Sequence, residues 1–156
     1  MQIILIRHGQ AEHQSSTDAK RALTALGESQ AQQTAAWLVN HDFQLDGLFV
    51  SPYLRAQQTA VHISQALDIP ITTCDYIRPD SQPLQTVKWL EQLELPEQAV
   101  IALVCHMPIV GLLASFFVDG DWQHGQAFQL AQAKVIELPL LTAGLGKQLT
   151  NFVPHP

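Results

Sequence analysis

The chain has 156 residues, of which 47% are hydrophobic and 14% are charged, a composition typical of a folded protein rather than a disordered one. This length suits one domain with a sizeable core, and we expect a single domain over residues 1–156. The formal net charge is −6 and no run of Lys or Arg occurs, which argues against nucleic-acid binding. An acidic protein that handles an anion must gather its few cations at one place, so the position of each arginine is informative.

The cellular compartment is indicated by the cysteines and by the apolar stretches. Cys74 and Cys105 lie in apolar surroundings without metal-ligand spacing, as expected of buried thiols in a reducing compartment. The apolar residues before Arg7 are too few for the core of a signal peptide. The apolar stretch 109–118 is too short to span a bilayer. We therefore expect a cytoplasmic protein with no membrane partner.

The first half of the chain alternates strand-like and helix-like patterns. Residues 3–6 form an aliphatic run typical of a strand buried on both faces, and the polar stretch 10–20 is expected to be a loop. Thr24 is a suitable N-cap for a helix that extends to about residue 39. A second strand is predicted over 47–50, followed by a helix that begins at Pro52 and ends near residue 67.

The second half continues this alternation. A strand interrupted by a proline is predicted over 69–74, and a helix over 84–93. The unbroken apolar run 99–105 is the strongest strand prediction, and Pro108 then opens a helix to about residue 118. The tail, roughly 126–153, is expected to supply one or two edge strands. The alternation predicts an α/β fold, a three-layer sandwich with a largely parallel central sheet and helices on both faces.

Histidine and arginine side chains fall at the carboxyl ends of three predicted strands. Arg7 and His8 follow the first strand, Arg55 comes shortly after the second, and His106 follows the strand that ends at Cys105. Ligands of open α/β sheets bind at this edge, where loops converge and helix N-termini point. Each residue alone has an ordinary structural interpretation, as a bonded histidine or a solvated charge. Their coincidence at one edge favours a binding site.

This residue set suits phosphoryl transfer. Arginine forms two parallel hydrogen bonds to phosphate oxygens and stays charged at any working pH. A neutral imidazole nitrogen is a good nucleophile, and a second histidine can hydrogen-bond a phosphoryl oxygen. Because such transfer is catalysed mainly by positioning and electrostatics, these residues could suffice without a metal or an organic cofactor, and we expect neither.

The same residues carry a resemblance to a known family. Arg7-His8-Gly9 after the first strand, the stretch Ser51-Pro52-Tyr53-Leu54-Arg55-Ala56-Gln57-Gln58-Thr59-Ala60, and the strand-terminal His106 resemble the motifs of the histidine phosphatase (phosphoglycerate mutase-like) superfamily. The small size and the segments 21–27 and 106–111 are similar to those of its SixA-type phosphohistidine phosphatases. The resemblance extends from Met1 to about Val118.

The resemblance implies a role for each site residue. His8 would be the nucleophile that becomes transiently phosphorylated, and His106 would complete the site. Arg7 and Arg55 would hold the phosphoryl group, with Arg21 as a further ligand. The implied activity is hydrolysis of phosphohistidine on a signalling or phosphotransfer protein. The alternatives are a small-molecule phosphomonoesterase of the same superfamily and a catalytically silent phosphohistidine-binding module.

Two departures from the family pattern concern residues beside the motifs. Gln10 follows the first motif where many members have an acid, and Ala22 stands where the SixA type often has proline. A third departure is more important, because the segment between Cys74 and Ala99 contains no clear motif for the general acid of larger members. Asp80, after Pro79, is the nearest candidate acid, although an aspartate in a proline-bounded turn is also an ordinary turn residue.

Overall fold

The central sheet of the molecule has six strands. The structure is a computed structural model that describes all 156 residues. The strands are β1 (Gln2–Arg7), β2 (Gly47–Val50), β3 (Ile71–Thr73), β4 (Val100–Cys105), β5 (Ala133–Glu137) and β6 (Lys147–Phe152). Their order in the sheet is β3-β2-β4-β1-β5-β6. β3, β2, β4 and β1 pair in parallel, whereas β5 is antiparallel to both β1 and β6.

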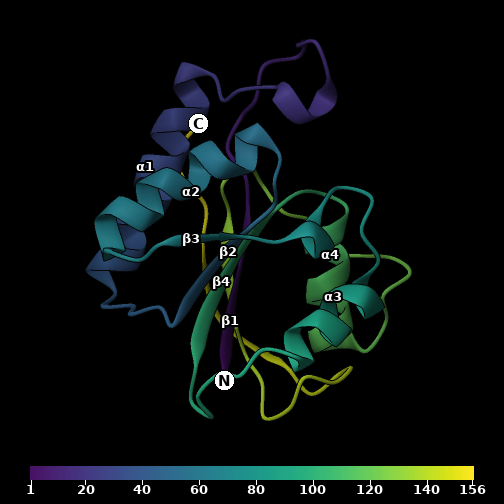
Figure 1. Cartoon of the computed structure of the whole chain (residues 1–156). Coiled ribbons are helices and arrows are strands. Elements are labelled where there is room, and N and C mark those ends of the chain that lie inside the picture. The colour runs from purple at the N-terminus through teal and green to yellow at the C-terminus, as the bar shows by residue number, and fades with distance from the viewer.

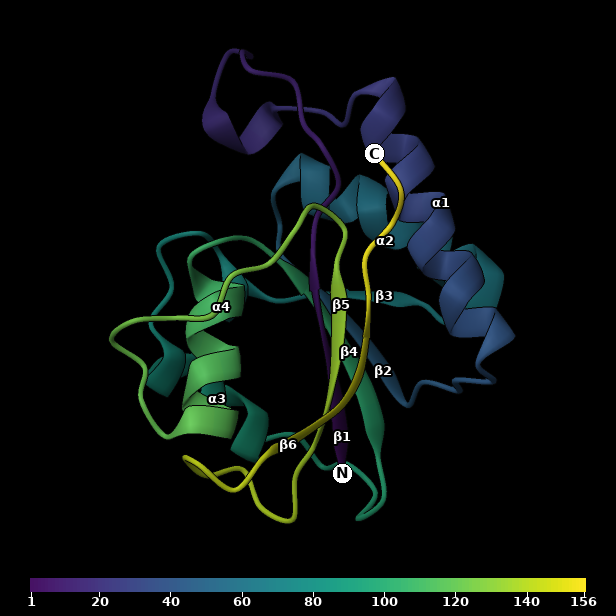
Figure 2. The same cartoon turned by 180° about the vertical axis from the view of Figure 1, so that it is seen from behind.

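Helices cover both faces of this sheet. They are α1 (Ala25–Asn40), α2 (Leu54–Leu67), α3 (Pro83–Glu91) and α4 (Ile109–Ala114), with short helical turns η1 (Asp18–Lys20), η2 (Asp75–Ile77) and η3 (Ser115–Asp119). α1 and α2 lie together on one side of the sheet, and α3 and α4 lie on the other (Figures 1 and 2). The predicted α/β sandwich with a largely parallel sheet is confirmed.

The first strand shows why its sequence is apolar without a break. Ile3 and Leu5 belong to a core cluster with residues of α3 and α4, whereas Ile4 and Ile6 belong to a second cluster with residues of α1 and α2. Successive side chains of a strand point to opposite faces, so a strand covered by helices on both faces needs apolar residues at every position. β4 has the same character, and its cysteine, Cys105, is a buried free thiol as expected.

The first residues of α1 and α2 can be compared with the helix starts predicted from the sequence. Thr24 is the N-cap of α1, and its Oγ1 accepts a hydrogen bond from the backbone N–H of Gly27 at 3.0 Å, as predicted. The prediction that Pro52 opens the second helix was wrong, because α2 begins at Leu54. Pro52 lies instead in a turn in which the backbone N–H of Tyr53 donates to Ser51 Oγ at 3.4 Å.

The tail differs from its prediction in one respect. β6 is an edge strand as expected, but β5 lies inside the sheet between β1 and β6. The buried polar residue of this strand is Lys134, whose Nζ donates to Gln126 Oε1 at 3.1 Å and to the carbonyl of Ala127 at 3.0 Å. A strand interior therefore contains a lysine whose hydrogen bonds are satisfied within the protein.

The parallel strands direct three loops to one end of the molecule. β1, β2 and β4 are neighbours in the sheet, and their carboxyl ends lie at the top of Figure 1, below the polar loop that contains η1. The helices are all too short or too polar to cross a membrane.

Candidate active site

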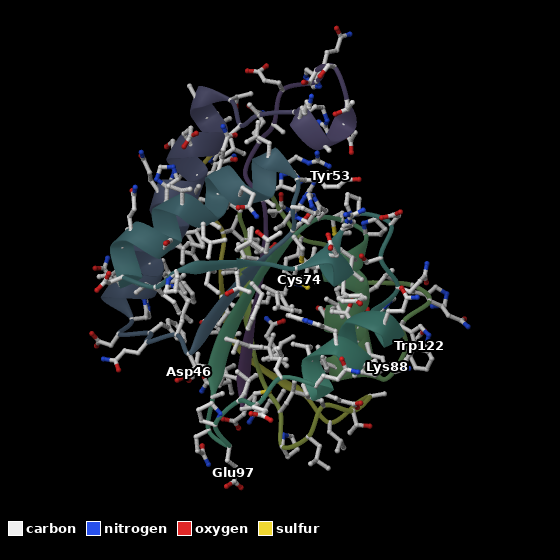
Figure 3. All side chains as sticks on the ribbon, viewed as in Figure 1. Asp46, Tyr53, Cys74, Lys88, Glu97 and Trp122 are labelled. Carbon is white, nitrogen blue, oxygen red and sulfur yellow. The ribbon has the colours of Figure 1, made fainter.

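Three strand ends bring His8, Ser51 and His106 together. The backbone N–H of His8 donates to the carbonyl of Cys105 at 3.0 Å, and that of Ser51 donates to Val104 at 3.0 Å, so the loops start in register with β4. The imidazole rings of His8 and His106 lie with their centroids 5.1 Å apart. Figure 3 shows the neighbouring Tyr53 at this end of the molecule, whereas Asp46 and Glu97 lie at the opposite end. The sequence-predicted convergence of the two histidines is therefore present in the structure.

The His8 ring is oriented by a backbone carbonyl. His8 is 7% exposed, and its Nδ1 lies 2.7 Å from the carbonyl oxygen of Gly9. A carbonyl can only accept, so Nδ1 carries the proton and the lone pair is on Nε2. Burial lowers the pKa of His8 to about 4, and the nearby positive charges of Arg55, Arg7 and Arg21 act in the same direction. The ring is therefore neutral near pH 7, with Nε2 free of a proton.

His106 is held by a serine hydroxyl. Its Nε2 lies 2.7 Å from Ser51 Oγ, and its Nδ1 is buried without any hydrogen-bond partner. Ser51 Oγ accepts from the Tyr53 N–H and donates its own proton to His106 Nε2 when that nitrogen is unprotonated. In this arrangement Nδ1 carries the ring proton and is an unused donor. Burial and the neighbouring His8 lower the pKa of His106, so this ring is neutral as well.

Arg55 contacts the imidazole of His8 directly. It lies in the first turn of α2, is 3% exposed, and its Nε is 3.3 Å from His8 Nε2. Its guanidinium also lies 5.1 Å from the ring centroid of Tyr53, which is within the range of a cation–π contact. The Arg55 guanidinium is therefore held by two contacts, one to the Tyr53 ring and one to His8 Nε2, the nitrogen that has the lone pair.

Arg7 and Arg21 flank this pair. Arg7 Nη1 donates to the carbonyl of Phe128 at 2.8 Å, and Arg7 Nε is buried without a partner. Arg21 is more open, and its Nη1 donates to the carbonyl of Glu12 at 2.9 Å. Buried side-chain polar atoms without partners are uncommon in proteins, and the two in this molecule are the nitrogens Arg7 Nε and His106 Nδ1. Both lie at this site, as expected where an anion binds.

An acidic residue that the sequence did not single out lies on these arginines. Asp18 Oδ1 is 2.8 Å from Arg21 Nε, and Asp18 Oδ2 is 3.2 Å from Arg55 Nη2. The hydrogen bond from Arg21 lowers the pKa of Asp18, and Arg55 adds to this effect, so the carboxylate is ionised. The only local signal for this contact was an aspartate three residues before Arg21. The bond to Arg55 joins residues far apart in the chain and leaves no mark in the sequence pattern.

Ser51 and Thr59 were also missed as individual site residues, although both stand in the motif that contains Arg55. Thr59 Oγ1 accepts the backbone N–H of Gly9 at 3.1 Å and thereby holds the loop that carries His8. The signal for Ser51 was its place at the carboxyl end of β2, the same criterion that identified His8 and His106.

Asp80, the candidate general acid, lies in the exposed turn between η2 and α3 and forms no hydrogen bond or ion pair with the other candidate residues. No carboxyl group is hydrogen-bonded to His8 or His106. No group of three or more His, Cys, Asp or Glu side chains has the geometry to hold a metal ion. The chemistry available at this site is thus that of two imidazoles, three guanidiniums and one ionised carboxylate.

The chain is similar in sequence to known proteins of one family. Residues 3–78 match the histidine phosphatase superfamily (branch 1). Phosphohistidine phosphatase SixA of Escherichia coli K12 is 29% identical over 125 residues, which are 78% of this chain and 76% of that protein. A SixA homologue of Haemophilus influenzae is 33% identical over 120 residues, 71% of this chain and 73% of the homologue.

A solved structure agrees with these sequence matches. The protein histidine phosphatase SixA, determined in complex with tungstate, superposes with a TM-score of 0.88 at 25% identity. The superposition covers 99% of this chain and 97% of SixA. The fold and these matches lead to one conclusion: the chain belongs to branch 1 of the histidine phosphatase superfamily and is similar to SixA.

Proposed function

We propose that the protein is a phosphohistidine phosphatase, a hydrolase that removes the phosphoryl group from a histidine of a signalling or phosphotransfer protein. The observation that carries the proposal is the buried neutral His8, whose unprotonated Nε2 lies 3.3 Å from Arg55 Nε, at a site that also contains the unpartnered nitrogens Arg7 Nε and His106 Nδ1. The similarity to SixA over most of the chain supports the same substrate class.

The first step would transfer the phosphoryl group to His8. Its Nε2 lone pair attacks phosphorus while the bond from phosphorus to the substrate's histidine breaks, so a phosphorus–nitrogen bond replaces another. Arg7 Nε and His106 Nδ1 would donate to the phosphoryl oxygens, as the two buried nitrogens that have no partner. Arg55 would turn its Nε from His8 to the same oxygens. In the second step a water oxygen displaces His8, and phosphate leaves.

The leaving group decides which substrates such a site can process. When the other ring nitrogen of a phosphohistidine is protonated, the histidine side chain leaves as neutral imidazole. The conjugate acid of this imidazole has a pKa of about 6.5. An alkyl ester must expel an alkoxide unless an acid protonates the bridging oxygen. Asp18 cannot serve as that acid, because its lowered pKa keeps it ionised. A site without a strong general acid therefore favours phosphorus–nitrogen bonds over alkyl esters.

Parallel turnover measurements test this substrate class. We expect ready hydrolysis of a phosphohistidine-bearing phosphotransfer domain, and rates for aryl and alkyl monoesters that fall steeply as the leaving-group pKa rises. Asp80→Asn should leave turnover of the phosphohistidine protein nearly unchanged, since Asp80 is exposed and unpaired. A flat leaving-group dependence, or a large loss in Asp80→Asn, would show that an acid acts and would favour a phosphomonoesterase.

A further inference from the structure

Asp18 contacts Arg55 and Arg21, two of the three arginines that the family resemblance implies as phosphoryl ligands. Arg55 has three nitrogen donors at the site: Nη1 donates to the backbone carbonyl of Asp18 at 2.8 Å, and Nη2 lies 3.2 Å from its carboxylate. The third donor, Nε, points at His8. The other carboxylate oxygen of Asp18 accepts from Arg21 Nε at 2.8 Å. Two guanidiniums are thus bridged by one carboxylate, in the manner expected of a bound oxyanion.

This carboxylate can leave its position at low cost. The side chain of Asp18 is 57% exposed, and it lies at the start of η1, a turn of only three residues. Together with Arg21 and residues 13–17 it lines a hollow of about 520 Å³ that contains no hydrophobic side chain. The carboxylate itself is solvent-exposed and its pair with Arg21 lies at the surface, so an entering group with more charge can replace it on both guanidiniums.

We propose that Asp18 is a specificity-determining residue: its carboxylate stands in for the phosphoryl group on Arg21 and Arg55 and must be displaced when a phosphorylated substrate binds. The proposal rests on the proposed function and on the role that the family resemblance implies for Arg21 and Arg55 as phosphoryl ligands. We call the Asp18 carboxylate the internal anion. Free phosphate and small monoesters compete with the internal anion for the two arginines through their phosphoryl group alone. A phosphorylated protein adds contacts outside the site and displaces the carboxylate more readily.

The internal anion also helps product release. Once His8 has been dephosphorylated, the product is inorganic phosphate held by the arginines. Return of the Asp18 carboxylate replaces the bonds that phosphate gives up, so the guanidiniums are not left unpaired. The displaced carboxylate stays tethered to the same loop and repels the bound phosphate through a partly solvated medium, which weakens phosphate binding by about tenfold.

The test is the affinity for inorganic phosphate, measured by calorimetry on the full chain. Asp18→Asn keeps the shape and the backbone carbonyl that Arg55 uses, but removes the charge. We expect this variant to bind phosphate about tenfold more tightly than wild type at low salt, with a smaller ratio at high salt. Asp18→Glu, which restores the charge, should return the affinity to within about threefold of wild type.

Asp75→Asn is the matched control. Asp75 begins η2 as Asp18 begins η1, and it pairs with Arg78 three residues later at 2.8 Å, but neither residue contacts the site. We expect its phosphate affinity to equal that of wild type. Unchanged or weaker phosphate binding by folded Asp18→Asn would overturn the proposal and show that Asp18 merely fixes the arginines.

The substrate assay separates this inference from the proposed function. Tighter phosphate binding in Asp18→Asn supports the internal anion even if the phosphohistidine protein is not hydrolysed. If the phosphohistidine protein is hydrolysed but Asp18→Asn does not bind phosphate more tightly, the proposed function stands and the internal anion is wrong.

Discussion

At the scale of single residues, burial determines the charge state of the site. His8 and His106 are 7% and 1% exposed, and both are surrounded by guanidinium groups. Desolvation and positive neighbours disfavour the imidazolium form, so both rings are neutral. A neutral ring has a lone pair to attack with, and this lone pair accepts from Arg55 Nε until the phosphoryl group binds.

This charge state predicts a pH dependence of stability. Folding lowers the pKa of His8 from 6.5 to about 4. Between these two pH values the unfolded chain therefore binds a proton at His8 that the folded protein does not bind. The stabilising contribution is therefore present above pH 6.5 and is lost as the pH falls towards 4. Between pH 7 and pH 5 the loss from His8 amounts to about 2 kcal/mol.

Urea unfolding of wild type and His8→Gln at both pH values measures this contribution. The variant should lose about 2 kcal/mol less than wild type on acidification, because glutamine does not titrate. His13→Gln, at an exposed position, is the control and should behave as wild type. Identical pH dependence in wild type and His8→Gln would contradict a buried neutral His8.

The residues of the site could be predicted to different degrees. His8, Arg55 and His106 were predictable because each follows a buried parallel strand, and such strand ends share one edge. Asp18 was not predictable, because its contact with Arg55 depends on how the 10–20 loop folds back over α2. Asp80 stays a candidate from the sequence alone, in a turn that makes no contact with the histidines.

At the scale of elements, the site depends on a close approach between α1 and the loop after β1. A Cβ atom on Gly27 would lie 2.0 Å from the carbonyl oxygen of Gln10, and one on Gly9 would lie 2.5 Å from the carbonyl oxygen of Gly27. Both obstacles are backbone atoms, which cannot move aside alone. The two glycines therefore set how closely α1 packs against the loop that carries His8.

Gly27→Ala tests this packing. Alanine is favoured over glycine within a helix by about 1 kcal/mol, yet we expect the substitution to lower the free energy of unfolding by about 2 kcal/mol through the backbone clash. Urea unfolding measures the change. Gln32→Ala, on the exposed side of the same helix, should stay within about 0.5 kcal/mol of wild type. If Gly27→Ala proved as stable as wild type, the close approach would not constrain the loop.

At the scale of the whole molecule, an acidic chain concentrates positive charge at one sheet edge. The net charge is −6, yet three of the four arginines lie beside the two histidines. The sheet and its two helical layers were predictable from the uninterrupted apolar strands and the helical spacing between them. The interior position of β5 was not, because Lys134 resembles an exposed strand residue until its bonds to Gln126 and Ala127 are known.

The most direct test of whether His8 is the nucleophile is to identify the residue that becomes phosphorylated during turnover. Wild type and His8→Ala would be mixed rapidly with a phosphohistidine-bearing protein, quenched in denaturant at alkaline pH, and mapped by mass spectrometry. We expect the phosphoryl group on His8 in wild type, none in the folded variant, and a fall in turnover of about a thousandfold or more. Phosphorylation of another residue, or turnover by His8→Ala above roughly a few per cent of wild type, would contradict the assignment.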